Sequence, residues 1–380
     1  MSVVKPSLAL LRSLSDEAVL RALMDAPRQT RAELALATGL SKPTAAEAIR
    51  RLEQAGLVRD TGERTSGRGG VGTYYALSDK VGIALAVSVA PDGIIAETVS
   101  PSGAVRHRVV EALHRPATPQ SVTRRLKKAA EEALHGLDTE SVRVAVVSAA
   151  DPVDRATGAL VHLPDAPFLL GAMSPAAAVR AMVSGPVHVD NDVNWAARTE
   201  REVRQQQHGV ELNDFVYLHL GEGLGCAVVA DAEVRRGHRG LAGEIAHVLV
   251  PGPSGRAAVP FITVFAQLGL RRAGSTAIDV TTLRDKLAAP GGRQLARPLA
   301  AAICGVLTAA TALCDPQIIV LGGAWGTTQR MIGAVQRAFA QQPRTVPIQA
   351  ALAADEPSLT GARARAIAKL RTDIISRSAS

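Results

Sequence analysis

The order of the apolar, strand-like segments after residue 81 limits this chain to few folds. The first three are separated only by tight turns at Pro91–Gly93 and Pro101–Gly103, which predicts a meander over 82–90, 93–100 and 104–112. Strands and helices then alternate along the chain. Strands are expected at 141–149, 185–191, 214–220, 225–231 and 316–323, and helices at 192–207 and from about Thr327.

A meander, then strand–helix units, then a hairpin across the segment GEGLG (221–225) is the order of actin-like, sugar-kinase (RNase H-like) folds. We therefore predict an α/β fold with a two-lobed, ATPase-type body over residues 81–380. The two lobes of such a body close over a nucleotide and a small ligand.

The N-terminal part of the chain has a different pattern, with three helices in quick succession. Ser15 is the predicted N-cap of the first helix, and Thr30 with Glu33 forms a capping box at the start of the second. Gly39 ends the second helix, because glycine adopts the left-handed conformation at little cost. Ser41 is the predicted N-cap of the third helix.

The third helix has the features of a DNA-recognition helix. Ser41, Lys42 and Thr44 lie at its front, where small and polar side chains can enter a major groove. Arg50 and Arg51 lie further along the helix and suit contacts to phosphates.

A hairpin completes this N-terminal domain. Strand patterns at 57–59 and 73–77 flank a basic, glycine-rich tip, from which Arg64 and Arg68 can reach the DNA backbone or the minor groove. Three helices and a wing predict a winged helix-turn-helix domain over residues 1–80. The alternative interpretation is a helical hairpin with no role in DNA binding.

The composition favours DNA only mildly and argues against other classes. The formal charge is +8 and the pI is near 9.8. Cys226, Cys304 and Cys314 form no CxxC pair, so we expect small apolar side chains rather than disulfides or metal ligands. The run at 299–314 is short and rich in alanine, which favours a buried helix over a membrane span. No secretory signal is predicted, and a cytoplasmic protein is expected.

A basic amphipathic helix is expected after the meander, at 122–134. Its cations are interpreted as a solvated face, and a second DNA contact is the alternative. These cations are Arg124, Arg125, Lys127 and Lys128.

Three motifs of the chain resemble those of the ROK family, in which repressors and sugar kinases share a fold. VDNDVNWAARTE (189–200) is similar to the family's Asn-Asp motif, GLAGEIAH (240–247) to its Gly-Glu-x-x-His motif, and DPQIIVLGG (315–323) to its adenosine-side strand. The resemblance covers the winged helix over about 15–77 and the body from about residue 81.

The resemblance implies a sugar site. Asn191 and Asp192 match the family's sugar ligand and general base, at a strand-to-helix corner where α/β folds often bind ligands. Glu244 and His247 match two further sugar contacts. Simpler interpretations stay open: Asp192 as a carboxylate favoured by the helix dipole, and Glu244 with His247 as an ordinary polar turn.

The phosphate-binding motifs depart from the family pattern. The family has an aspartate and glycines just after the first strand, whereas this chain reads SVA (88–90) and Asp92 falls in the turn. The second phosphate loop, Gly-Thr-Gly in the family, carries Glu222, which should repel a polyanion by about a kcal/mol or more at close range. We therefore interpret Asp192 as a relic of the general base and expect no enzymatic activity.

Further departures affect the sugar loop, a metal site and the wing. Asp151 stands where the sugar loop usually has a glycine. The family's cysteine-rich element joins the histidine on a structural zinc and supplies a sugar-binding glutamate, but this chain reads VLVPGPSGRAAVPFITVF (248–265) there. His247 alone is one of the four ligands that zinc needs, so no metal and no cofactor are expected. The wing, GRGGVG (67–72), lacks one arginine of the family's tip but keeps Arg68.

These features lead to three functional hypotheses. The favoured one is a DNA-binding transcriptional regulator, a repressor of carbohydrate-related genes, whose inactive kinase-like body senses a sugar or sugar derivative. As a homodimer or homotetramer it would bind an inverted repeat in double-stranded DNA, and ligand binding would shift its recognition helices. The alternatives are a regulator whose body binds another metabolite or only scaffolds the dimer, and an ATP-dependent sugar kinase with an extra domain.

Overall fold

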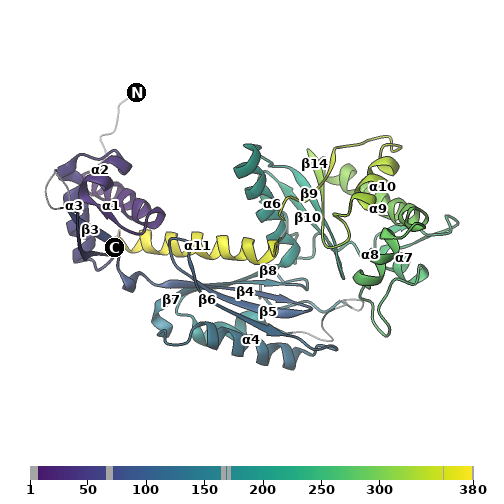
Figure 1. Ribbon diagram of the computed structural model, residues 1–380, viewed down its shortest axis with the longest axis horizontal. Helices are drawn as coiled ribbons and strands as arrows, with labels where there is room; N and C mark the ends of the chain where they lie inside the picture. Colours follow the sequence, from purple (N-terminus) through teal and green to yellow (C-terminus); the bar gives the residue numbers. More distant parts are fainter. Residues whose placement is uncertain (1–6, 66–71, 164–167, 169–172, 354, 379–380) are drawn as a thin grey trace.

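The computed structural model describes residues 7–65, 72–163, 168, 173–353 and 355–378. A small N-terminal unit is followed by two lobes, and the C-terminal helix runs back from the lobes to the N-terminal unit (Figure 1).

The N-terminal unit consists of three helices and a small antiparallel sheet in the order β1-β3-β2. The predicted strand at 73–77 is confirmed, and the strand predicted at 57–59 continues to Arg64. A short 3-10 helix, Asp79–Val81, leads into the body. The elements are α1 (Leu8–Asp25), β1 (Gln29–Thr30), α2 (Arg31–Thr38), α3 (Lys42–Gln54), β2 (Val58–Arg64) and β3 (Thr73–Leu77).

Local capping bonds fix α2 and α3 as predicted. Oγ1 of Thr30 accepts from the backbone N of Glu33 at 3.3 Å, and the Glu33 carboxylate accepts from the backbone N of Thr30 at 2.7 Å. Gly39 ends α2 in the left-handed conformation, with φ of 68°. Ser41 caps α3 by accepting from the backbone N of Thr44 at 3.2 Å.

The start of α1 was predicted wrongly. Ser7, not Ser15, is the N-cap, and its Oγ accepts from the backbone N of Leu10 at 3.2 Å. Ser15 is buried within the helix and donates to the carbonyl of Arg12 at 2.8 Å. The first turns of α1, before Ser15, carry apolar side chains that are exposed to solvent, so the sequence there lacks the alternation of buried and exposed positions typical of a helix. These side chains are Leu8, Leu10, Leu11 and Leu14.

The N-terminal lobe is a five-stranded sheet in the order β6-β5-β4-β7-β8. The predicted meander is confirmed as antiparallel, and β4, β7 and β8 are parallel. Helix α4 covers one face of the sheet and α11 the other (Figure 1). The elements are β4 (Ile83–Ala90), β5 (Gly93–Val99), β6 (Val105–Ala112), α4 (Pro119–Ala133), 3-10 helix Thr139–Ser141, β7 (Val142–Ala149), α5 (Pro175–Val179), 3-10 helix Arg180–Met182, β8 (Val187–Asn191) and α11 (Pro357–Ser378).

The C-terminal lobe holds a second five-stranded sheet, in the order β11-β10-β9-β14-β15, with a hairpin of β12 and β13 beside it. β9 and β10 form the predicted hairpin. The elements are α6 (Asp192–His208), β9 (Phe215–Leu220), β10 (Leu224–Ala230), β11 (Glu233–Val234), β12 (Leu249–Pro251), β13 (Ala258–Pro260), α7 (Phe261–Gln267), α8 (Val280–Ala288), α9 (Gly292–Cys314), β14 (Ile318–Gly322), α10 (Gln329–Phe339) and β15 (Ile348–Ala350).

Helix α9 is a core helix of the C-terminal lobe. Among the described residues it is the one helix long and apolar enough to cross a membrane. Its Leu299, Ile303 and Leu307 are buried against the lobe's sheet and helices, as predicted for this apolar run. Cys304 is buried on the same helix, whereas Cys314 at its end is partly exposed.

The cations of α4 do not face the winged helix. Arg125 and Lys128 form ion pairs with Glu111 on β6, at 3.1 and 2.5 Å. Arg124 and Lys127 are exposed to solvent. Because α4 lies on the face of the sheet opposite α11 and the N-terminal unit (Figure 1), the solvated interpretation of these charges is favoured over a second DNA contact.

Helix α11 joins the three parts of the molecule. One apolar cluster runs from the core of the N-terminal unit, through one face of the β4–β7 sheet and the inner face of α11, to Trp195 on α6. Arg371 of α11 donates to the carbonyls of Pro101 at 2.7 Å and Met24 at 3.2 Å, so it ties a turn of the lobe to the end of α1. Arg377 donates to the carbonyl of Val81 at 3.0 Å.

The crossing of α11 over α6 depends on a glycine. A Cβ atom at Gly361 would lie 2.4 Å from the carbonyl oxygen of Trp195 and 2.9 Å from Oγ1 of Thr199. Thr199 Oγ1 also donates to the carbonyl of Pro357 at 2.6 Å. The two helix backbones are therefore in direct contact at this point.

The substitution Gly361→Ala is expected to lower the free energy of unfolding by about 1–3 kcal/mol, because the added methyl group must push α11 away from α6. Gly291→Ala is the matched control, since nothing lies within 4 Å of a Cβ there and the residue has an ordinary φ. Urea denaturation measures both. Equal stability of the two variants would contradict the close crossing.

Candidate functional site

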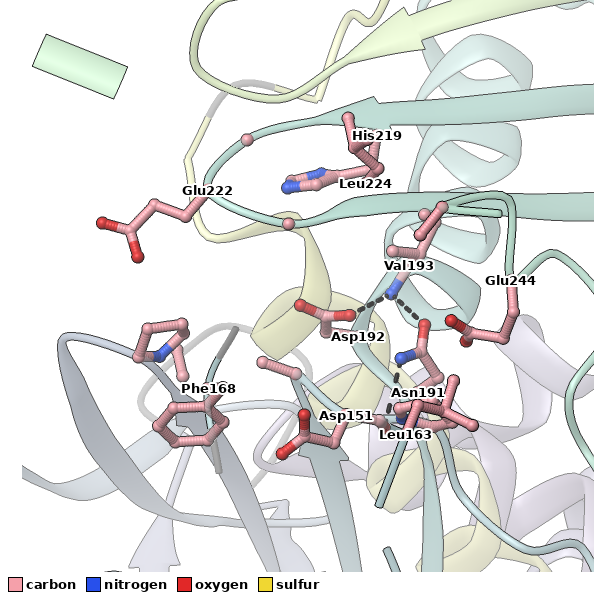
Figure 2. A pocket seen from close by; sticks show the side chains of 18 of the residues that line it. Asp151, Leu163, Phe168, Asn191, Asp192, Val193, His219, Glu222, Leu224 and Glu244 are labelled. Atoms are coloured by element: carbon pink, nitrogen blue, oxygen red, sulfur yellow. Dashed lines mark hydrogen bonds between the residues drawn. The ribbon is translucent and has the colours of Figure 1, made fainter. Parts of the chain in front are cut away.

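A pocket of about 490 Å³ lies between the two lobes, which is enough volume for a small metabolite. Its polar groups come mainly from the loop after β7, the start of α6, the β9–β10 loop and the loop of residues 237–247. The β4–β5 turn, Arg115 and Arg272 also line it. Figure 2 shows Asp151, Asp192 and Glu244 around its floor, with Phe168 and Leu163 among the apolar lining residues.

The predicted pair Asn191 and Asp192 lies at the corner where β8 ends and α6 begins. Asn191 caps α6: its Oδ1 accepts from the backbone N of Val193 at 2.9 Å, and its Nδ2 donates to the carbonyl of Asp151 at 3.2 Å. Oδ1 of Asp192 also accepts from the backbone N of Val193, at 2.8 Å. The second oxygen of Asp192 points into the pocket (Figure 2), so this carboxylate both bonds the first turn of α6 and faces the pocket.

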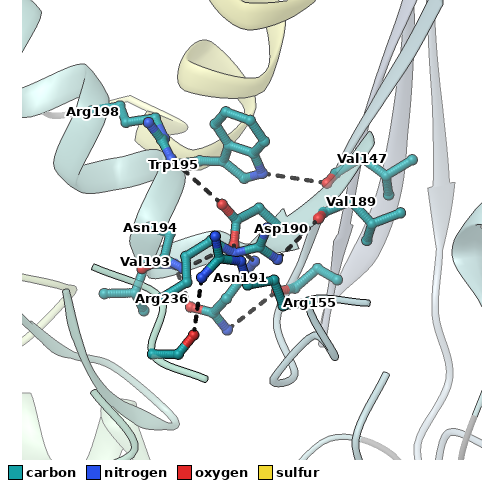
Figure 3. Close-up of polar contacts among 12 residues, drawn as sticks. Val147, Arg155, Val189, Asp190, Asn191, Val193, Asn194, Trp195, Arg198 and Arg236 are labelled. Carbon is teal, nitrogen blue, oxygen red and sulfur yellow. Dashed lines mark hydrogen bonds and ion pairs between the residues drawn. The ribbon is translucent and has the colours of Figure 1, made fainter. Parts of the chain in front are cut away.

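A buried acid supports this corner from behind. Asp190 is 4% exposed, and its Oδ1 accepts from the backbone N of Asn191 at 2.9 Å and from Nδ2 of Asn194 at 2.8 Å. Arg236 and Arg198 form ion pairs with it at 3.1 and 3.7 Å (Figure 3). Because its charge is balanced by two arginines, Asp190 is a positioning residue and not a ligand of the pocket.

Glu244 and His247, the other predicted pair, also line the pocket. The preceding Gly243 has φ of 94°, and a Cβ there would lie 1.7 Å from the carbonyl oxygen of Cys226, so only glycine fits. The backbone N of Cys226 donates to the Gly243 carbonyl at 3.0 Å, which fixes this loop to β10. Glu244 is half-buried and His247 is exposed.

The pocket holds carboxylates whose ionisation is suppressed. Burial, and then the charges of Asp192 and Glu244, raise the pKa of Asp151 to about 7. Burial also raises the pKa of Asp192 to about 7, and burial followed by the charge of Asp192 raises that of Glu244 to about 7. Burial lowers the pKa of His219, on β9, to about 4, so its imidazole is neutral at pH 7.

The β9–β10 loop does not fit a nucleotide's phosphates. The Glu222 carboxylate accepts hydrogen bonds from Nη2 of Arg115 at 2.5 Å and from Nη2 of Arg272 at 2.7 Å. Both arginines that line the pocket are therefore already paired with a carboxylate. A polyphosphate would have to displace Glu222 against charge repulsion. Asp92 lies in the β4–β5 turn, as predicted.

The residues after His247 do not fit a zinc ion either. Strands β12 and β13 pair as a hairpin, and the backbone N of Phe261 donates to the Val248 carbonyl at 2.9 Å. Val250 is 1% exposed and packs against Gly305 of α9. No group of three or more His, Cys, Asp or Glu side chains is placed to hold a metal ion among the described residues.

The predicted DNA-binding residues of α3 divide into two groups. Ser41, Lys42 and Thr44 are exposed at its N-terminal end, and the two hydroxyls are 2.8 Å apart. Arg50 is exposed and donates to Glu47 at 2.6 Å. Arg51 turns back toward α1, where it donates to Oδ1 of Asp16 at 2.6 Å and to Oγ of Ser15 at 3.1 Å.

The half-buried Arg51 thus has a structural role that local sequence reasoning did not anticipate, because its partners lie on another helix. On the wing, Arg64 is exposed and pairs with Asp60 at 3.0 Å. Arg68 lies outside the described residues. Arg115 and Arg272 were also missed, since their common partner Glu222 is distant from both in the sequence.

Comparisons with known proteins match both parts of the chain. A model described as the ROK family matches residues 102–369, and a model described as winged helix-turn-helix DNA-binding matches residues 12–59. A solved ROK family transcriptional regulator, a homologue of the E. coli MLC protein, has a TM-score of 0.59 and 18% identity, and the match covers 97% of this chain and 99% of that one. These matches confirm the predicted fold class.

Kinases are also similar to the body. The bifunctional enzyme NanE/NanK of Brucella suis is 31% identical over 168 residues, which cover 42% of this chain and 30% of that enzyme's length. The N-acetylmannosamine kinase of Citrobacter koseri is 27% identical over 275 residues, or 67% of this chain and 90% of the kinase. The chain thus spans less than a third of the first relative and most of the second.

The substitution Asp151→Asn is expected to stabilise the protein at pH 8 by on the order of 1–3 kcal/mol. The folded pKa of about 7 exceeds the usual value near 3.9 of an unfolded chain, so the folded protein keeps a proton that the unfolded chain releases. Wild-type stability from this group therefore falls as the pH rises from about 4 to about 7, whereas asparagine has no charge to lose.

Urea denaturation at pH 4 and pH 8 measures this difference, which should nearly vanish at pH 4. Exposed Asp138, at the start of a 3-10 helix that its side chain does not cap, gives the control Asp138→Asn. A gain from Asp151→Asn that is the same at both pH values would contradict an ionisation effect.

Proposed function

Because this chain belongs to the ROK family and begins with a winged helix, we propose that it is a DNA-binding transcriptional regulator, a repressor, of carbohydrate-related genes. Residues 1–80 bind DNA, and residues 81–380 bind a sugar or sugar derivative and form the dimer. The regulator works in the cytoplasm as a homodimer or homotetramer. The alternative that the kinase relatives favour is an ATP-dependent sugar kinase.

The observation that carries this proposal is the exposed N-terminal end of α3. Ser41, Lys42 and Thr44 are all exposed there, and Lys42 forms no ion pair with any described residue. A helix end with a free cation and small polar side chains suits a major groove. Arg50 on α3 and Arg64 on β2 suit the phosphates beside it, and Arg68 is proposed for the wing tip.

The packing supports a route from the pocket to this DNA-binding face. Asp192 begins α6, and Trp195 in the same first turns is buried against α11. Helix α11 in turn contacts α1 through Arg371 and through the shared apolar cluster. A ligand that moves the start of α6 would therefore move α11 and the winged helices of a dimer, which changes their spacing on an inverted repeat.

Loss of catalysis is supported by the phosphate loop. Phosphoryl transfer needs backbone and cationic groups free to bind the phosphates. Here Glu222 occupies Arg115 and Arg272. Asp192, with a pKa of about 7, could still act as a general base. The proposed loss of catalysis therefore rests on the phosphate loop and not on Asp192.

The substitution Lys42→Ala should weaken binding to a cognate duplex about tenfold and lower the salt slope of the binding constant by about 1, because one phosphate or groove contact is lost. The duplex comes from sequencing genomic fragments retained by the purified protein. Fluorescence anisotropy at several salt concentrations measures the binding. Lys127→Ala, the same change on exposed α4, should bind as wild type, and equal loss in both variants would place the DNA elsewhere.

A coupled assay with ATP and a panel of hexoses should show no turnover above the buffer rate, because no phosphate site is open. A hexokinase in the same assay is the positive control. Turnover that disappears in Asp192→Asn would identify a kinase and overturn the proposed loss of catalysis.

A further inference from the structure

The floor of the pocket brings together three carboxyl groups that no arginine or lysine of the described residues pairs with. Asp151, Asp192 and Glu244 line its floor from three different segments, and their carboxylates lie around one space (Figure 2). No lysine or arginine forms an ion pair with any of these three in the part of the chain that the structure describes. The other ionisable lining groups are Asp92, Glu222, Arg115, Arg272, His219, His247 and Cys226.

Asp151 has a buried carboxylate oxygen that lacks a hydrogen-bond donor among the described residues. It is 4% exposed, and its Oδ2 is buried without a hydrogen-bond partner. Its backbone is fixed, because its carbonyl accepts from Nδ2 of Asn191 at 3.2 Å. A buried carboxylate oxygen without a donor costs several kcal/mol unless a bound group supplies one.

The missing partner is a donor that carries positive charge. Like charges at Asp192 and Glu244 add to the cost of ionising Asp151, and a cation among them would remove that cost for all three. A metal ion does not fit, since no three acidic, histidine or cysteine side chains of the described residues are placed to ligate one. An ammonium group fits, because it donates hydrogen bonds to separate acceptors and needs no common coordination sphere.

We propose that the effector bears a protonated primary amine beside hydroxyl groups, as in an amino sugar or aminocyclitol, with its ammonium bound by Asp151. Asp192 and Glu244 accept from neighbouring hydroxyls or share the ammonium. The apolar lining, with Phe168 and Leu163, covers the ring. This inference rests on the proposed sensing function of the pocket and names its ligand class.

Isothermal titration calorimetry of the full chain at pH 7.5 tests the ligand class. The probes are matched pairs that exchange an amine for a hydroxyl: D-glucosamine with D-glucose, D-galactosamine with D-galactose, D-mannosamine with D-mannose, and scyllo-inosamine with scyllo-inositol. In at least one pair the amine should bind ten or more times tighter. Equal or tighter binding of the hydroxyl member in every pair would overturn the proposal.

Binding of no probe at all would overturn it too. DNA binding by the same preparation distinguishes failure of the ligand class from failure of the proposed function. If the protein binds its duplex selectively but binds no amine, only the ligand class is wrong. If it does not bind DNA, the proposed function is wrong.

Variants test the role of Asp151. Asp151→Asn should weaken binding of the preferred amine at least tenfold and change the affinity for its hydroxyl partner less than threefold. Asp138→Asn removes an equal charge from the surface of the same lobe and should change neither affinity. A cooperative urea transition of Asp151→Asn confirms folding, so unchanged amine affinity in the folded variant would contradict the assignment.

Discussion

The packing of α11 is the constraint on which the arrangement of the other parts depends. This single helix lies on the sheet of the N-terminal lobe, crosses α6 in backbone contact at Gly361, and reaches α1 through Arg371. Its apolar face is continuous with the core of the winged helix, so the winged-helix unit packs against the body and is not joined to it by a flexible linker alone. A change at the pocket corner thus has a rigid element to act on.

The pocket shows how a binding site can oppose stability. Asp190 is neutralised by Arg198 and Arg236 and holds its corner in place. Among the described residues, Asp151 nearby has no cation partner, and its Oδ2 has no hydrogen-bond donor. The arrangement at Asp190 favours a single conformation of the corner. The unpartnered oxygen of Asp151 lowers the stability of the ligand-free protein. A ligand that donates a hydrogen bond to this oxygen would remove that free-energy cost, and this gain would favour binding.

Features set by neighbours in the sequence could be predicted, and features set by distant partners could not. The capping box at Thr30, the left-handed Gly39 and the cap at Ser41 each depend on a few adjacent residues. The apolar period located the strands of the N-terminal sheet and β9, β10 and β14 of the C-terminal sheet, but not the short edge strands β11 and β15. The pocket residues Asn191, Asp192, Glu244 and His247 were found through motif resemblance. The start of α1, the helix α11, the pairing of Arg51 with Asp16 and the two arginines on Glu222 all depend on tertiary contacts, which no local pattern encodes.

The β12–β13 hairpin carries a consequence for the conditions under which this lobe stays folded. Backbone pairing and the burial of Val250 against α9 hold the segment, and its own residues include no thiol. Its shape therefore does not depend on the supply of a metal or on the redox state of the cell. Metal starvation or an oxidative burst would therefore leave this hairpin, and its packing on α9, intact.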